Sequence, residues 1–349
     1  ALSSFIATCL MALLSNYPFV LAPGMGLNAY FAYTVVLGMG YSWQQALVAV
    51  FVEGIIFILL SLTNVREAIF DAIPLNLKKG VSVGIGIFIA FIGLQNAKLV
   101  IGNKSTLVSI TNFTKDFHTA GICSLLAVIG LLITVILYIK KVPGSILIGI
   151  LATWVIGMLC QITGIYVPDF KTGYYSLFPT FAMTDFSKLG ETFGKCFQYD
   201  LGKVGIFNFI AVVLSFLFVD LFDTLGTLVG VSTKAGMLDE EGKLPGIKSA
   251  LMADAVATTA GAVLGTSTVT TFVESSSGVA AGGRTGLTAV VSGFLFLIST
   301  LFAPLFTAIP SFATAPALIM VGFLMLTSIT KIDFSDYTEA IPCFIAIIA

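Results

Sequence analysis

The chain has 349 residues, of which 57% are hydrophobic and 10% are charged, and its formal net charge is −1. Its mean hydropathy is +1.03. Soluble domains carry about 25% charged residues, so this composition excludes a soluble globular protein and indicates a chain that crosses a membrane many times. The balanced charge provides no basic face that could neutralise phosphates, so no nucleic-acid partner is expected.

Apolar runs recur along the whole chain, and a helix needs about 20 apolar residues to cross a bilayer. In chain order the candidate spans are 1–14, 17–37, 43–62, 80–97, 119–139, 143–165, 204–232, 247–264, 267–281, 286–308, 310–330 and 337–349. These segments predict an all-α polytopic membrane protein. The runs 1–14 and 337–349 are shorter than a full span, and we expect the first and last spans of the fold to lie outside this chain.

Two of these segments are unsuited to a continuous helix. Segment 17–37 contains two prolines and two glycines, and segment 267–281 is rich in Thr, Ser and β-branched residues. Such backbone is tolerated at membrane depth only where it is buried in protein or lines a polar cavity. The two segments lie about 250 residues apart, on either side of the polar connector 166–203. This pairing predicts a transporter of inverted repeats with a site at the bilayer midplane.

The short loops that carry Lys and Arg predict the orientation. When the spans alternate, these loops all fall on one side, beginning with 63–79, and the opposite side receives 98–118 and 166–203. The positive-inside rule then makes the basic loops cytoplasmic, in a multi-pass protein of the plasma or inner membrane. Amphipathic pieces near 65–76 and 184–200 are expected to lie along the inner and outer surfaces.

Carboxylates inside the apolar runs are the main functional signal. Asp220 and Asp223 lie three residues apart in one span, and Glu274 lies in a broken segment. An intramembrane acid costs about 2.5–3.5 kcal/mol on insertion scales, so each is a candidate site residue. Glu53 and Asp254 are also intramembrane acids. We expect a structural role for Glu53, and the sequence shows no partner for Asp254.

The residue types that hold metals or perform covalent catalysis are few. The five cysteines form no CxxC pair, and the one histidine, His118, lies in a polar connector. The chain contains no GxSxG, HExxH or GxxxxGK[ST] motif. The sequence therefore predicts no metal, no cofactor and no enzymatic activity.

Three motifs resemble those of a known family. They are Asn16–Phe31 (NYPFVLAPGMGLNAYF), Val219–Leu228 (VDLFDTLGTL) and the stretch from Gly265 to Gly283. In order and separation they are similar to the motifs of the AzgA-like purine (hypoxanthine, guanine and adenine) permeases within the nucleobase-ascorbate transporter superfamily. The resemblance covers essentially the whole chain.

This resemblance implies fourteen spans in two inverted seven-span repeats, each divided between a core and a gate domain. Mapped onto this chain, the first repeat supplies core residues 1–64 (spans two to four) and gate residues 65–165 (spans five to seven). The polar outer connector 166–203 follows, then core residues 204–308 (spans eight to eleven) and gate residues 309–349 (spans twelve and thirteen). Spans three and ten would each be a short extended stretch followed by a half-helix. The resemblance also suggests a homodimer through the gate domains, which the sequence itself leaves open.

The resemblance also implies roles for particular side chains. Asp220 and Glu274 become the principal base-binding acids, because a carboxylate accepts the ring N–H bonds of a nearly neutral purine. Asn28, at the break in the third span, joins them, with capping of that break as its alternative role. Further candidates are the hydroxyl of Ser275 and the ring of Phe272 for substrate binding, and Asp223, Thr224 and Thr271 for proton coupling or support. Simple helix–helix hydrogen bonding is the alternative for Asp223.

The sequence thus predicts a secondary active transporter that imports purine nucleobases by proton symport, with the core domain moving against the gate domain. Its expected partners are the purine base, a proton and the lipid bilayer. An anion carrier of the same fold, for sulfate or bicarbonate, is an alternative that acidic Asp220 and Glu274 oppose by repulsion. A uracil or xanthine permease and coupling to sodium also stay open, as does the preferred purine.

Overall fold

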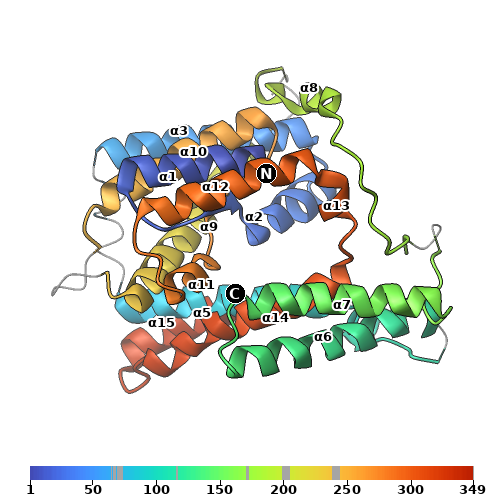
Figure 1. The fold of residues 1–349 in the computed structure, drawn as a ribbon. Helices are drawn as coiled ribbons and strands as arrows, with labels where there is room; N and C mark the ends of the chain where they lie inside the picture. The colour runs from blue at the N-terminus through green and yellow to red at the C-terminus, as the bar shows by residue number, and fades with distance from the viewer. Residues whose placement is uncertain are drawn as a thin grey trace. The chain divides into compact units, whose positions relative to one another are not determined.

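The described part of the chain is mostly helical (Figure 1), and it contains two short antiparallel strand pairs. This computed structural model describes residues 1–63, 65, 68, 74–114, 117–169, 173–198, 205–237 and 244–348. The chain divides into two compact units. Unit 1 comprises Ala1–Gly84, Asp185–Leu301 and Ser328–Ala349, and unit 2 comprises Ile85–Thr184 and Phe302–Thr327.

Most elements belong to unit 1. Before residue 85 they are α1 (Leu2–Ser15), β1 (Leu21–Pro23), α2 (Met25–Ala29), the π-helix η1 (Tyr30–Gly38) and α3 (Trp43–Leu62). After residue 184 they are η3 (Phe186–Lys188), α8 (Leu189–Thr192), η4 (Lys195–Phe197), α9 (Ile206–Ala235), α10 (Ile247–Leu264), β4 (Val269–Thr271), α11 (Ser275–Ala280), α12 (Gly286–Leu301) and α15 (Tyr337–Ile348).

Unit 2 contains β2 (Val100–Asn103), β3 (Leu107–Ile110), η2 (Phe117–Gly121), α6 (Ile122–Ile139), α7 (Ser145–Ile162), α13 (Ala303–Thr307) and α14 (Ser311–Leu326). Helix α5 (Leu75–Asn96) and the short helix η6 (Thr327–Lys331) continue from one unit into the other.

Seven helices within the described part of the chain are long and apolar enough to cross a membrane. They are Trp43–Leu62, Lys79–Asn96, Phe117–Ile139, Ser145–Ile162, Ile206–Ser232, Ile247–Leu264 and Ser311–Lys331. Three shorter apolar helices, Leu2–Ser15, Gly286–Leu301 and Tyr337–Ile348, accompany them. The chain is therefore a multi-pass membrane protein, as its composition predicts.

Helices α3 and α10 match the predicted segments 43–62 and 247–264 residue for residue. Helix α3 begins with a capping box, in which Ser42 Oγ accepts from the N–H of Gln45 at 3.2 Å and the Ser42 N–H donates to Gln45 Oε1 at 2.9 Å. Helix α10 ends at Gly265, whose φ of 93° is disfavoured for side-chain-bearing residues. Local sequence signals therefore set both helices.

One predicted helix is wrong in its extent. Segment 286–308 was expected to be continuous, but the chain breaks at Phe302, between α12 and α13. Pro304 follows in the first turn of α13. In the first turn of a helix a proline loses no hydrogen bond, since the N–H there has no intrahelical acceptor, so Pro304 favours the start of a new helix after Phe302.

The two broken segments cross each other in unit 1. Strands β1 and β4 pair antiparallel, with Leu21 opposite Thr271 and Pro23 opposite Val269. Beyond the ladder, Gly24 N–H donates to the carbonyl of Thr268 at 3.1 Å, and Phe272 N–H donates to the carbonyl of Val20 at 2.8 Å. We call residues 20–24 and 268–272 the crossing. Each strand leads into a short helix, α2 or α11, which confirms the predicted extended stretch and half-helix.

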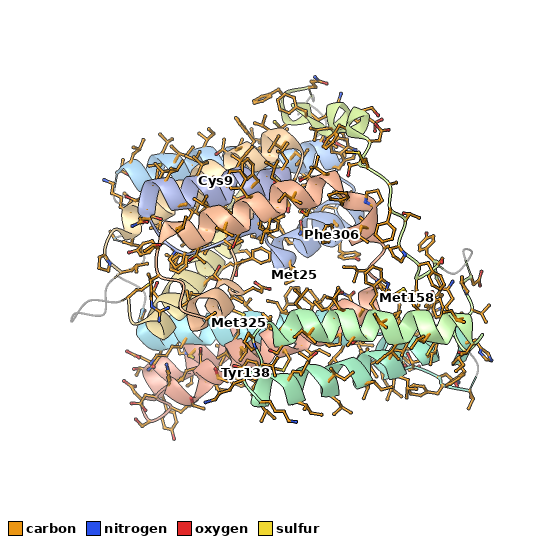
Figure 2. The ribbon with its side chains drawn as sticks, viewed as in Figure 1. Cys9, Met25, Tyr138, Met158, Phe306 and Met325 are labelled. Carbon is orange, nitrogen blue, oxygen red and sulfur yellow. The ribbon has the colours of Figure 1, made fainter. Side chains whose placement is uncertain are left out.

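The supports of the two strands repeat each other. Thr8 of α1 donates its hydroxyl to the carbonyl of Leu21 at 3.1 Å, and Thr258 of α10 donates to the carbonyl of Val269 at 2.9 Å. Helix α1 lies along α12, and α10 lies along α3 (Figure 1). Figure 2 labels Cys9 on α1, and a Cβ at Gly293 of α12 would lie 3.1 Å from its sulfur. Each broken strand is thus held by one helix of a closely packed pair, as inverted repeats require.

Close packing of α3 on α10 depends on Gly54. A Cβ there would lie 2.9 Å from the backbone nitrogen of Thr259 and 3.0 Å from its Cα. The Thr259 hydroxyl already donates to the carbonyl of Ala255 at 2.9 Å. A Cβ at position 54 would therefore meet the backbone of Thr259, which cannot rotate away as a side chain could.

We expect Gly54→Ala to force these helices apart and to cost about 1–3 kcal/mol, the range for overpacked cores. Thermal unfolding of the purified protein in detergent measures this. Gly230→Ala is the matched control, because a Cβ at Gly230 of α9 meets nothing within 4 Å. Equal melting temperatures for the two variants would contradict the packing argument.

Unit 2 is built on α6, α7 and α14, which pack on one another. Helices α6 and α7 approach through glycines that face threonines. A Cβ at Gly130 would lie 2.9 Å from Thr153 Cγ2, and one at Gly149 would lie 3.0 Å from Thr134 Cβ. The indole N–H of Trp154 donates to the carbonyl of Leu177 at 2.8 Å and holds the following connector.

The connectors hold structure that hydropathy did not reveal. Residues 100–110 form the β2–β3 hairpin, whose turn is closed by Asn103 Oδ1 accepting from the N–H groups of Ser105 and Thr106 at 2.8 and 3.2 Å. The region 184–200 contains three short helical pieces, η3, α8 and η4, in place of one amphipathic helix. Gly194, with a positive φ of 68°, separates α8 from η4. The predicted piece at 65–76 lies largely outside the described residues.

Candidate functional site

The predicted acids gather beside the crossing in unit 1. Helix α9 packs against β4, α11 and α2, so one helix face meets both broken segments. Asp220 and Asp223 lie three residues apart on that helix and share a face. Asp220 is fully buried, at 0% exposure, whereas Asp223 is partly exposed. The two neighbouring acids therefore stand in different surroundings.

Asp223 lies at the junction between β1 and α2. Its Oδ2 is 3.6 Å from the place a Cβ would occupy at Gly24. Figure 2 labels the next residue, Met25, where α2 begins. The negative charges of Asp254 and Glu274 also act on Asp223. Asp223 of α9 therefore lies beside the first broken segment, within electrostatic range of acids on α10 and directly after β4.

Thr224 links Asp220 to Asp254. Its Oγ1 lies 3.2 Å from Asp220 Oδ1, 3.0 Å from Asp254 Oδ2 and 2.7 Å from Thr270 Oγ1 of β4. All three contacts are buried, and Thr224 and Asp254 are 0% exposed. We call Asp220, Thr224, Asp254 and Thr270 the hydroxyl–carboxyl network. It connects α9 and α10 to a strand of the crossing.

The number of hydroxyl protons limits the protonation states that this network can adopt. Thr224 and Thr270 each have one hydroxyl proton, which can make two hydrogen bonds between them. Three contacts meet at Thr224, so the third needs a proton from a carboxylic acid. When all three contacts are hydrogen bonds, either Asp220 or Asp254 is protonated. In that arrangement one proton lies between the network and one of its two buried acids.

Residues at the end of β4 join the two broken segments. Ser275, the first residue of α11, accepts from the N–H of Val20 through its hydroxyl at 2.9 Å. The Phe272 N–H donates to the Val20 carbonyl, and its ring is partly buried. Glu274, between them, is partly exposed. The structure brings these three predicted residues together, with the Ser275 side chain bound to backbone.

Asn28 and Thr271 occupy the flanks of the crossing. Asn28 of α2 is exposed, accepts from the hydroxyl of Ser267 through Oδ1 and donates from Nδ2 to the carbonyl of Pro23 at 3.4 Å. Thr271 of β4 is 2% exposed, and within the described part of the chain its Oγ1 has no hydrogen-bond partner. Asn28 therefore ties the two segments together, while the Thr271 hydroxyl is buried and unsatisfied.

Sequence reasoning missed the partner of Asp254 and the contact between Ser267 and Asn28. An acid inside an apolar helix was the only available signal for Asp254, because its partner Thr224 lies 30 positions earlier in the chain. The rings of Tyr30 and Phe31 in η1 both pack on Phe216, with ring centroids 4.9 and 6.4 Å away. Among the described residues, no group of three or more His, Cys, Asp or Glu side chains is arranged to hold a metal ion.

Comparison with known proteins identifies the fold and the family. The transmembrane domain of the cyanobacterial bicarbonate transporter BicA superposes with a TM-score of 0.67 at 16% identity, covering 99% of this chain and 86% of that one. This likeness establishes the inverted-repeat transporter fold alone.

Sequence relatives are much closer. Putative permease MJ0326 of Methanocaldococcus jannaschii is 49% identical, covering 99% of this chain and 74% of that protein. Guanine/hypoxanthine permease PbuG of Bacillus subtilis is 46% identical, covering 100% of this chain and 74% of that protein. Adenine permease AdeQ of Escherichia coli is 39% identical, covering 98% of this chain and 73% of that protein. The permease-family model matches residues 1–349. The chain is thus a transporter rather than an enzyme, and it belongs to the permease family, the nucleobase-ascorbate transporters that its three motifs indicated.

Proposed function

We propose that this chain imports purine nucleobases, with hypoxanthine, guanine and adenine as candidate substrates. The observation that carries the proposal is the set of acids beside the crossing of two broken segments: Asp220 and Asp254 both contact Thr224, which contacts Thr270 of β4, and Asp223 Oδ2 lies beside Gly24. Carboxylates accept hydrogen bonds from neutral ring N–H groups, and they repel anions. Relatives that cover this chain almost completely are guanine/hypoxanthine and adenine permeases.

The proposed base-binding residues are Glu274, Asn28, Ser275, Phe272 and the acids of α9. The sequence predicts that Asp220 contacts the base and that Asp223 supports it. Their burial favours an exchange of these roles, because Asp220 is enclosed in the hydroxyl–carboxyl network and Asp223 is the acid partly open at the β1–α2 junction. We propose that Asp223 and Glu274 bind the base while Asp220 holds the proton with Thr224 and Asp254.

Coupling to protons follows from this network. A buried carboxyl pair that shares one proton can load it on one side of the membrane and release it on the other as solvent access changes. Thr270 brings the network into contact with β4, so proton binding and the substrate site share one strand. Thr271, the next residue along, supports the strand from its other face. We propose proton symport on these grounds.

Movement of a core domain against a gate domain would alternate access to this site. The chain divides into two compact units, which supports a two-body movement, although the bounds of unit 2 (Ile85–Thr184 and Phe302–Thr327) differ from those of the gate domain proposed from the sequence. The core and gate boundaries proposed from the sequence, and a homodimer through the gate domains, are parts of the same proposal. Trapping the transporter with cross-links between the two predicted domains would test the movement.

The protein is proposed to lie in the plasma or inner membrane with its basic short loops in the cytoplasm. Lys140 and Lys104 are both exposed; Lys140 directly follows α6, and Lys104 lies in the turn of the β2–β3 hairpin, in the connector that precedes α6. We expect a cysteine at Lys104 to react with a membrane-impermeant maleimide in intact cells, and one at Lys140 to react only after permeabilisation. The unsubstituted protein, with its five native cysteines, is the control. The reverse pattern would invert the orientation.

The direct test is uptake of radiolabelled hypoxanthine into cells without purine permeases of their own. We expect uptake that rises at acidic external pH, is abolished by a protonophore and is blocked by guanine or adenine. Uracil, xanthine and sulfate serve as competitors that separate the alternatives. Uptake that depends on sodium, or that sulfate alone inhibits, would reject proton-coupled purine transport.

A further inference from the structure

Glu53 is a buried acid to which the transport proposal gives no role. It lies in α3 at 0% exposure, and its Oε2 accepts from the hydroxyl of Thr268 at 2.9 Å. The next residue, Gly54, packs directly on the backbone of α10. A buried carboxyl group is costly in an apolar interior. The contact with Thr268 links Glu53 of α3 to the residue directly before β4.

Thr268 stands where second-repeat backbone meets first-repeat backbone. Its carbonyl accepts from the N–H of Gly24 at 3.1 Å, directly before α2, and its hydroxyl reaches Glu53. The preceding residue, Ser267, donates to Asn28 Oδ1. Two consecutive residues of the second repeat therefore make three polar contacts with the first repeat. We call the pair Glu53 and Thr268 the crossing clasp.

The strands themselves are too short to set their own register. Strands β1 and β4 are three residues each, and a two-stranded pair is marginal without further support. A slip of one residue turns every side chain to the opposite face. In the observed register Thr270 meets Thr224 of α9, whereas Thr271 does not. A slip would replace Thr270 with a neighbour and would shift Glu274 along the crossing.

We propose that Glu53 is a positioning residue, which sets the register of the crossing through Thr268 and so places Glu274 and Thr270 for transport. The inference rests on the proposed purine transport for its kinetic readout, and it also has a structural readout that needs no substrate. Thr8 and Thr258 hold single strands to single helices, whereas the clasp joins the two repeats.

The kinetic experiment compares Thr268→Val, which keeps the shape and removes the hydroxyl, with Thr268→Ser, which keeps the hydroxyl. We expect Thr268→Val to raise the KM for hypoxanthine about tenfold, as loss of one well-placed hydrogen bond does, with little change in maximal rate per transporter. Thr268→Ser should behave as wild type. Glu53→Leu should match Thr268→Val, and Glu53→Gln, which retains an acceptor, should match Thr268→Ser.

Thr153→Val is the matched control. This buried threonine of α7 donates within its own helix, to the carbonyl of Gly149 at 2.7 Å. It should reach the membrane in the same amount as wild type and keep the wild-type KM. A wild-type KM for Thr268→Val, or an equal defect in Thr268→Ser, would overturn the proposal.

The structural experiment uses oxidative cross-linking of Leu21→Cys with Thr271→Cys, residues that face each other across the strands. The linked peptide is measured by mass spectrometry in purified protein. Adding Thr268→Val should lower its yield severalfold, and Thr268→Ser should restore it. An unchanged yield with Thr268→Val would reject a register role. If wild-type protein shows no purine uptake, the proposed function fails while this measurement still decides the clasp.

Discussion

Replacing Glu274 with Gln is expected to reduce purine uptake by about 10- to 100-fold while the protein still reaches the membrane, because a hydrogen bond to an ionised group contributes about 1.5–3 kcal/mol and each 1.4 kcal/mol is tenfold. Glu274 directly follows the crossing and is partly exposed, so its carboxylate can accept from a ring N–H. A glutamine turns part of that acceptor edge into a donor and opposes the same N–H group. Initial rates of hypoxanthine uptake, normalised to transporter in the membrane, measure the effect.

Glu191→Gln is the control for Glu274→Gln, since Glu191 is exposed on α8 and is not among the proposed site residues. It should transport as wild type does. Parallel measurements on Asp220→Asn and Asp223→Asn separate the two acids of α9. A KM increase confined to Asp223→Asn supports the exchanged roles, and one confined to Asp220→Asn supports the assignment made from the motif. Wild-type uptake by Glu274→Gln would remove Glu274 from the site.

Asp254→Asn is expected to abolish proton-driven accumulation of purine while exchange of base across the membrane persists. The amide N–H can make the third contact at Thr224 permanently, so the network resembles its protonated state and has no proton to release. Net import needs that release, whereas exchange of one base for another does not. Accumulation under an imposed pH gradient and counterflow from preloaded vesicles measure the two activities separately.

The control for this substitution is Asp333→Asn, at an exposed position of the connector before α15. It should retain both activities. Thr224→Val should resemble Asp254→Asn in losing acid stimulation, and Thr224→Ser should keep it. Acid-stimulated accumulation by Asp254→Asn at the wild-type level would show that the coupling proton binds elsewhere.

The sequence alone determined where the chain crosses the membrane and where it is broken. A bilayer imposes a length and an apolar composition on every span, so α3 and α10 could be bounded to the residue. Proline and glycine in segment 17–37, and Thr and Ser in segment 267–281, predicted the interruptions because they disfavour continuous helix. Three long motifs were sufficient for the family. The break at Phe302 and the β2–β3 hairpin were missed, since hydropathy does not record turns inside apolar runs or pairing inside connectors.

Only the tertiary structure decided which polar groups meet. Asp254 was visible as a misplaced charge, yet its partner Thr224 lies 30 residues away on another helix, and Glu53 meets Thr268 across 215 residues. Asp220 and Asp223 look alike in sequence, and packing of α9 against β4 buries one and leaves the other partly open. A hydrogen bond depends on helix rotation and strand register to within a fraction of a residue. Composition and residue spacing specify neither the rotation of a helix nor the register of a strand. The packing of the two repeats sets both.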